Sequence, residues 1–231
     1  MSRYRALLFD LDHTLWDYET NSAETLTEIY HRHQLQNLGA GTLREFLETF
    51  TRVNNELWKQ YDSGAIGREV IRFERFHHIL KSIDIDNYEL SLQLSNEYVA
   101  ESPRKSHLLP GARKVLDYLY DKYPMVIVTN GFDEIQGTKL QSSGIEKYFK
   151  SVVTSERAGY KKPAPEIFAF AMNAAGASHE ETVMIGDNLL TDIGGARQAR
   201  IDTIFFNPGR QPYEHEATHE IHALEQLMTM L

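Results

Sequence analysis

Five short apolar runs constrain the fold of this chain most, because each has the length of a strand and helical patterns separate the later ones. The runs cover residues 6–9, 125–128, 151–154, 182–185 and 203–206. Most are rich in β-branched residues and almost continuously apolar, which is typical of strands buried on both faces. The pattern predicts an α/β fold in which helices cover both faces of a parallel sheet.

The segment between the first two runs has a different character. From about Glu19 to Ala100, apolar residues recur at spacings of three and four, most regularly from Leu43 to Tyr61. This spacing is typical of amphipathic helices, and glycines near positions 39–41 and 64–67 mark turns between them. We therefore expect a helical bundle inserted directly after the first strand.

Composition excludes several classes of function. The 231 residues include 33 Asp and Glu against 24 Lys and Arg, a formal charge of −9, which argues against a nucleic-acid polymer as partner. The absence of cysteine excludes disulfides and thiolate chemistry. No apolar run approaches the roughly 20 residues of a membrane span, and the first residues do not resemble a signal peptide. We expect a soluble, cytoplasmic monomer or homodimer without a membrane partner.

Polar residues follow three of the predicted strands at the point where each ends. In an open parallel sheet, ligands bind beyond the carboxyl ends of the strands, so these residues are expected to share one site. Taken singly, each group also fits an ordinary turn or helix cap. The groups, in chain order, are Asp10 with Asp12, Thr129 with Asn130, the loop Lys161-Lys162-Pro163, and Asp187.

The expected site would gather four acids: Asp10, Asp12, Asp187 and Asp192. Such a cluster is repulsive without a cation, and a hard divalent ion, above all Mg²⁺, would relieve the repulsion. One carboxylate could attack a phosphate ester as nucleophile, and a second could protonate the leaving oxygen and then activate water. The groups that could hold the phosphate oxygens are Thr14, Thr129, the backbone amides of Asn130 and Gly131, and Lys162.

The ordered set of these groups resembles the four motifs of the haloacid dehalogenase (HAD) superfamily. The matching motifs are Asp10-Leu11-Asp12-His13-Thr14, Thr129-Asn130-Gly131, Lys162-Pro163 and Gly186-Asp187 with Asp192. The resemblance covers essentially the whole chain. It implies a three-layer, Rossmann-like core formed by residues 1–17 and 105–231, with an α-helical cap, residues 18–104, inserted after the first strand.

The same resemblance implies a role for each matching residue. Asp10 would be the nucleophile and Asp12 the general acid/base, while Thr129 and Lys162 would bind the phosphoryl group. Lys161 is a rival for the lysine role, but the family lysine directly precedes the proline. The Mg²⁺ ligands would be Asp10, Asp187 and the main-chain carbonyl of Asp12, with Asp192 as a supporting acid.

Asp12 bears on the type of reaction. Dehalogenases and phosphonatases of the superfamily lack an acid two residues after the nucleophile, so Asp12 favours phosphoryl transfer. Phosphomutases keep both acids and stay open as an alternative. A catalytically idle binding or regulatory module is the alternative from another class, and the intact motifs argue against it.

The substrate is expected to be a small phosphorylated metabolite. Two parts of the sequence are similar to the house-cleaning pyrimidine 5′-nucleotidases of the superfamily. They are the stretch Val53–Ile66, and the stretch Thr129–Phe132 followed by Gln136 and Leu140. That similarity implies a nucleoside 5′-monophosphate with a pyrimidine or non-standard base; a phosphatase of sugar or metabolite phosphates is the alternative. Aromatic side chains would stack on a base, although some of these positions also suit a helix core. The candidates for substrate contact are His13, Trp16, Trp58, Tyr61 and Phe132.

Three histidines near the end of the chain are spaced like metal ligands on a helix: His215, His219 and His222. Glutamates surround them, and this favours a solvated surface over a metal site.

Overall fold

The computed structural model describes residues 3–214 and 217–231. The chain divides into two compact units, one formed by Met1–Tyr18 with Ser106–Leu231 and the other by Glu19–Lys105. We refer to them as the core unit and the helical unit. Each boundary lies one residue beyond the one expected from the sequence.

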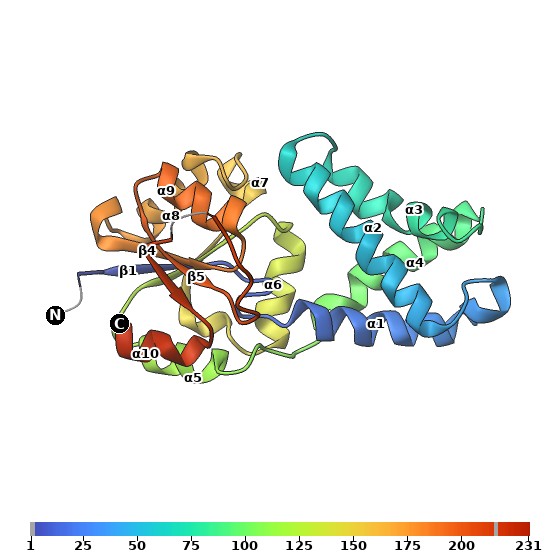
Figure 1. Cartoon of the computed structure of the whole chain (residues 1–231), viewed down its shortest axis with the longest axis horizontal. Coiled ribbons are helices and arrows are strands. Elements are labelled where there is room, and N and C mark those ends of the chain that lie inside the picture. Colours follow the sequence, from blue (N-terminus) through green and yellow to red (C-terminus); the bar gives the residue numbers. More distant parts are fainter. Residues whose placement is uncertain (1–2, 215–216) are drawn as a thin grey trace. The chain divides into compact units, whose positions relative to one another are not determined.

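The core unit is built on a six-stranded, wholly parallel sheet in the order β3-β2-β1-β4-β5-β6 (Figure 1). The α/β prediction is confirmed, and the first five strands coincide with the five apolar runs. The sixth strand was not predicted, because only one of its three residues is buried. The strands are β1 (Ala6–Phe9), β2 (Met125–Thr129), β3 (Phe149–Thr154), β4 (Thr182–Gly186), β5 (Asp202–Phe206) and β6 (His219–Ile221).

Helices cover both faces of this sheet, as the almost continuously apolar strands require. Successive side chains of a strand point to opposite faces, so β1 contributes Leu7 and Phe9 to one apolar cluster and Ala6 and Leu8 to another. The first cluster packs on α5 (Ala112–Leu119), α6 (Asp133–Ser142) and α10 (Leu227–Met230). The second packs on α8 (Pro165–Ala175) and α9 (Gly195–Gln198) (Figure 1). The three-layer, Rossmann-like prediction is therefore confirmed.

The helical unit contains only helices and turns over residues 19–105, all of which are described. Its longest helix, α2 (Leu43–Ser63), confirms the helix expected from the spacing of its apolar residues. A capping box of Thr42 and Glu45 begins α2, and Gly64 ends it with φ 81°. Within the predicted bundle, a π-helical turn, Val70–Glu74, leads directly into α3. The other helices are α1 (Tyr18–Arg32), α3 (Arg75–Lys81) and α4 (Tyr88–Glu101).

The two chain segments that flank the helical unit are paired with each other within the core unit. The amide of Asp17 donates to the carbonyl of His107 at 3.1 Å, and the amide of Leu109 donates to the carbonyl of Leu15 at 2.9 Å. Trp16 and Leu108 form an antiparallel bridge between these bonds. The core unit therefore closes on itself just before and just after the insertion.

None of the helices within residues 3–214 and 217–231 combines the length and the apolar character needed to cross a membrane.

Candidate active site

Asp10 lies at the carboxyl end of the central strand of the sheet. Its amide donates to the carbonyl of Ile185 at 2.9 Å, so the residue directly after β1 is still held by β4. Phe9 pairs with Ile127 on β2 and with Ile185 on β4. Asp10 thus stands between the ends of two neighbouring strands, which is the position predicted for a ligand site.

Lys162 joins Asp10 to Asp192. Its ammonium donates to Asp10 Oδ1 at 2.5 Å and to Asp192 Oδ1 at 2.6 Å. All three side chains are buried: Lys162 is 2% exposed, Asp10 7% and Asp192 0%. The second oxygen of Asp192 accepts from the amide of Asn188 at 3.0 Å. Asp192 therefore has both oxygens engaged, and its main effect in this arrangement is to hold Lys162 beside Asp10.

Three of the four expected acids come together in the structure. Asp10, Asp187 and Asp192 each offer a carboxylate oxygen, and these atoms lie within 4.8 Å of one another. Thr14 donates to Asp187 Oδ1 at 3.0 Å. Burial, together with a neighbouring carboxylate in each case, raises the pKa of Asp10 to about 7 and the pKa of Asp187 to about 6 against the opposing effect of Lys162. Burial and mutual repulsion make these carboxyl groups resist ionisation, and a hard divalent cation would favour their charged forms. Carboxylate oxygens are also the ligands that such a cation prefers, so the group fits one.

The Asp12 carboxylate is not part of this group, so three of the four expected carboxylates share the position. The metal ligand expected from Asp12 is its main-chain carbonyl, which is a different atom, and that expectation stays a prediction. The Asp12 carboxylate lies instead against Lys139, whose ammonium donates to both of its oxygens, at 2.6 and 2.7 Å. The Lys139 ammonium also lies 4.4 Å from the centre of the Trp16 ring. In an extended segment, side chains two positions apart point to the same face, so Asp10 and Asp12 would be expected to face one site. In the structure they contact two different lysines, Asp10 contacting Lys162 and Asp12 contacting Lys139.

The segment after β2 organises the loop of Lys162. The side-chain amide of Asn130 donates to the Lys162 carbonyl at 3.0 Å and accepts from the Lys162 amide at 2.7 Å. The Thr129 hydroxyl accepts from the Gly131 amide at 3.0 Å, which leaves the hydroxyl proton to donate to a ligand. The Gly131 amide, expected to hold phosphate, is thus engaged within the loop in this structure.

The aromatic residues expected to touch substrate fall into different environments. Trp16 is fully buried in the core cluster, so the expectation that it contacts substrate is wrong. Phe132 is 5% exposed, and His13 is exposed with its ring 4.9 Å from that of Tyr18. In the helical unit, the half-buried Trp58 meets Tyr61 edge to face with ring centres 5.5 Å apart.

Of the three histidines near the end of the chain, the two that are described, His219 and His222, do not lie on a helix. His219 begins β6, and His222 Nδ1 lies 2.9 Å from the carbonyl oxygen of Asn207. His215 lies outside the described residues. The spacing of these histidines therefore indicates no helical metal site.

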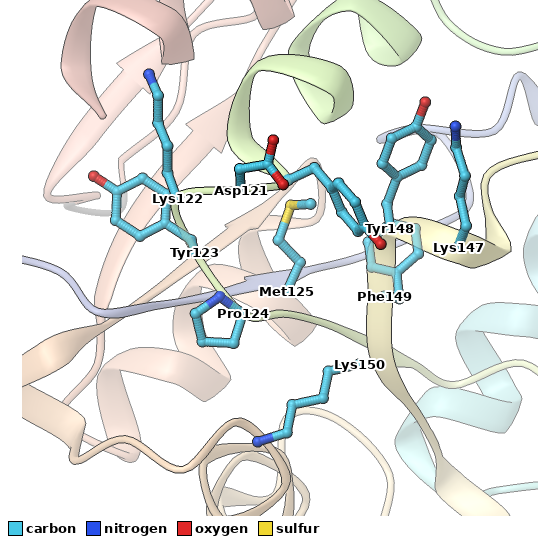
Figure 2. Close-up of a pocket in the computed structure, with 10 residues that line it drawn as sticks. Asp121, Lys122, Tyr123, Pro124, Met125, Lys147, Tyr148, Phe149 and Lys150 are labelled. Atoms are coloured by element: carbon cyan, nitrogen blue, oxygen red, sulfur yellow. The ribbon is translucent and has the colours of Figure 1, made fainter.

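A cavity of about 380 Å³ lies where β2 and β3 begin, away from the strand ends that carry the acids. Its lining includes Lys122, Lys147 and Lys150, but Figure 2 shows their ammonium groups pointing away from one another. These cations therefore do not converge on a ligand.

Lys139 is the site residue that no sequence pattern indicated. It lies within α6, 127 positions from the Asp12 that it binds, so no local spacing links the two.

Fold and site together define an α/β protein of the Rossmann-like type that carries a buried aspartate beside a lysine at the end of its central strand. The chain belongs to the haloacid dehalogenase-like hydrolase family, whose model matches residues 4–200. This membership agrees with the resemblance seen in the four sequence motifs.

Three relatives span nearly the whole chain. YfnB of Bacillus subtilis is 31% identical over 100% of this chain and 97% of its own length. The pyrimidine 5′-nucleotidase PynA of Streptococcus pneumoniae is 31% identical, covering 99% and 95%. The glyceraldehyde 3-phosphate phosphatase of Pyrococcus furiosus is 28% identical, covering 100% and 94%. A crystal structure of YfnB bound to magnesium matches with a TM-score of 0.88 and 29% identity over 99% of both chains.

Proposed function

We propose that this protein is a Mg²⁺-dependent phosphatase that hydrolyses nucleoside 5′-monophosphates by way of an aspartyl-phosphate on Asp10. The observation that carries the proposal is the buried contact of Lys162 with Asp10 at 2.5 Å, at the end of the central strand. An ammonium in this place would neutralise an incoming phosphate and hold one oxygen of Asp10 while the other attacks phosphorus.

The acids supply the remaining parts of the reaction. Asp10 and Asp187 would hold Mg²⁺, which would neutralise the phosphate and favour the ionised form of Asp10. Thr129 would donate its hydroxyl proton to a phosphate oxygen. Asp12, whose carboxylate lies outside the group of three acids and is bound by Lys139, would protonate the leaving oxygen and then take a proton from the attacking water.

The relatives support two substrate classes. PynA is a pyrimidine 5′-nucleotidase, and this supports a nucleotide, the class that the sequence of α2 also favours. The Pyrococcus relative is a glyceraldehyde 3-phosphate phosphatase, so small sugar phosphates are the second candidate. Both substrates are alkyl phosphate esters and require the same four residues of the core unit: Asp10, Asp12, Thr129 and Lys162.

A panel of phosphorylated metabolites tests the proposal. Released phosphate is measured for dUMP, UMP and dTMP against glyceraldehyde 3-phosphate and hexose phosphates, each with Mg²⁺ and with EDTA. We expect the nucleotides to be hydrolysed fastest and EDTA to abolish turnover. Sugar phosphates that outpace all three nucleotides would refute the nucleotide assignment, and isomerised product without free phosphate would indicate a mutase.

Two variants test the nucleophile. Asp10→Asn keeps the shape of the side chain, and we expect it to lower kcat by more than about 1,000-fold. Asp121→Asn, an exposed acid at the other end of β2, is the matched control and should retain activity. Hydrolysis by Asp10→Asn at the rate of the unaltered protein would remove Asp10 from the mechanism.

A further inference from the structure

We propose that Lys139 is a positioning residue that holds the Asp12 carboxylate in place for proton transfer to and from the leaving group. This inference rests on the phosphatase function proposed above and assigns a residue to that reaction which none of the sequence motifs contains. The juxtaposition that suggests it is a second lysine–aspartate pair beside the first. Lys162, from the loop before α8, binds Asp10, and Lys139, from helix α6, binds Asp12.

The contact between Lys139 and Asp12 fixes the direction of the carboxylate. The ammonium reaches both oxygens, at 2.6 and 2.7 Å, so rotation of the carboxylate would break a contact in either direction. The Lys139 side chain is 7% exposed and that of Asp12 is 24% exposed. Because the lysine is largely shielded from water, this contact is stronger than a pair between two surface side chains.

Lys139 is itself held from the other side. Its ammonium lies over the ring of Trp16 at 4.4 Å and within 6.0 Å of the ring of Tyr18. Trp16 is fully buried, so packing in the core fixes the position of the ring below the ammonium. A cation over an aromatic face is attracted by the ring electrons, which gives Lys139 a second fixed contact.

The pair has a consequence that goes beyond stability. With both oxygens on an ammonium, Asp12 is turned away from the three acids that could hold a cation, and its carboxylate is kept out of that group. A general acid/base must stay within reach of the reacting oxygen instead of becoming a metal ligand. In this arrangement the ammonium of Lys139 takes the place that a metal ion would otherwise take beside Asp12.

Asp12 acts in two steps of the proposed reaction. As an Asp10 oxygen forms a bond to phosphorus, the bond to the leaving oxygen breaks, and that oxygen takes the proton from Asp12 in its protonated form, the form in which the preceding turnover leaves it. The Asp12 carboxylate then takes a proton from the water that attacks the aspartyl-phosphate, and inorganic phosphate leaves as the Asp10 oxygen is released. Lys139 holds the carboxylate between these two steps, and it gives and takes no proton itself.

The test compares leaving groups. p-Nitrophenolate leaves readily without a proton, whereas an alkoxide needs one. Lys139→Met keeps the length of the side chain, Lys139→Arg keeps the charge, and Lys147→Met alters an exposed lysine as matched control. For each, kcat and KM are measured with p-nitrophenyl phosphate and with the alkyl ester that the unaltered protein hydrolyses fastest in the panel.

We expect Lys139→Met to lower kcat for the alkyl ester by about 10- to 100-fold, within the range that general acid–base catalysis contributes. In the first turnover, the rate of leaving-group release from p-nitrophenyl phosphate should stay within about threefold while that of the alkyl ester falls, because only the alkyl leaving group needs the proton; slower hydrolysis of the aspartyl-phosphate would be common to both esters. Lys139→Arg should restore most of the alkyl activity. The Mg²⁺ concentration for half-maximal activity should fall in Lys139→Met, because the freed Asp12 carboxylate adds an oxygen ligand beside the ion. Lys139→Gln keeps a hydrogen-bond donor and replaces the methionine variant if that variant does not fold.

Equal losses on both esters in the first-turnover rate of leaving-group release, or no loss on either, would overturn the role of Lys139. A protein that in its unaltered form hydrolyses neither p-nitrophenyl phosphate nor any alkyl phosphate would instead refute the proposed function. The two failures are therefore distinguishable in the same set of measurements.

Discussion

Replacing Lys162 with methionine removes the ammonium that lies between two buried carboxylates. Methionine keeps an unbranched side chain of nearly the same length, so the change is mainly one of charge. The ammonium contacts Asp10 at 2.5 Å and Asp192 at 2.6 Å, and the oxygens of these acids lie within 4.8 Å of each other. Without Lys162, two like charges would remain close together in a region shielded from water.

The expected loss of stability follows from that burial. Removing one partner of a buried ion pair costs about 3–5 kcal/mol, because a charge is left uncompensated. For a chain of this length, roughly 2–4 °C of Tm corresponds to 1 kcal/mol, so the Tm of the metal-free Lys162→Met variant should fall by about 6–20 °C at pH 8. Burial already raises the pKa of Asp10 to about 7, and loss of the ammonium would raise it further. Protonation at pH 5.5 should therefore recover part of the loss.

The assay is thermal unfolding of the full chain, measured by calorimetry with EDTA at pH 5.5 and pH 8 and then repeated with Mg²⁺. The quantity compared is the Tm of the transition of the core unit. The neighbouring, half-buried Lys161 provides the matched control, and Lys161→Met should shift Tm by less than about 3 °C. The double variant Lys162→Met with Asp192→Asn removes one of the two uncompensated carboxylate charges, that of Asp192. We expect this double variant to be more stable than the single Lys162→Met variant at pH 8.

Three results would contradict this reasoning. A loss of Tm under about 2 °C at pH 8 would mean that the carboxylates are not buried as charges. A loss of Tm that is equal at pH 5.5 and pH 8 would show that the loss does not depend on the ionisation of the carboxylates. A double variant less stable than the single one would show that Asp192 stabilises the core by another contact.

Two further changes and one pH series test the same region. A methyl group at Gly195 would lie 2.8 Å from the backbone of the loop that carries the lysine, so Gly195→Ala should cost about 1–3 kcal/mol in unfolding and lower kcat. A methyl group at Gly131 would lie 1.9 Å from Gln136 Nε2, so Gly131→Ala should lower Tm. Adding Gln136→Ala should restore Tm, and a Tm that stays low in this double variant would contradict the clash with Gln136. Burial raises the pKa of Asp10 to about 7 and of Asp187 to about 6, so the metal-free folded state holds protons that the unfolded chain releases. Its Tm in EDTA should therefore fall as pH rises from 5 to 8, and a rising Tm would refute those pKa values.

The fold was predictable where burial on both sides left a clear trace in the sequence. The strands β1, β2 and β4 are buried along their whole length because helices cover both faces of the sheet, and each appears in the sequence as an apolar run. The edge strand β6 has only Ile221 buried and therefore no apolar run that could indicate it. The π-helical turn Val70–Glu74 was not predictable either, since its apolar spacing is close to that of an α-helix.

The site was predictable to the extent that it depends on the ends of strands. Asp10 and Asp187 each follow a buried strand directly, and the topology alone brings them to one edge of the sheet. The direction of the Asp12 carboxylate was not predictable, because it depends on Lys139 in a helix far along the chain. The burial of Trp16 likewise depends on packing between distant elements, and no local spacing indicates it.

The paired segments that flank the helical unit bear on how such proteins diversify. Because Leu15–Asp17 and His107–Leu109 are held together within the core unit, the two ends of the insertion are fixed close to each other. A loop whose ends are already joined can lengthen cheaply, since each doubling of its length costs only about 0.6 kcal/mol in closure entropy. The 87 residues of Glu19–Lys105 can therefore be exchanged, shortened or enlarged over evolutionary time without rethreading the sheet. The sheet and the strand ends that carry the acids can then stay unchanged while the inserted unit changes.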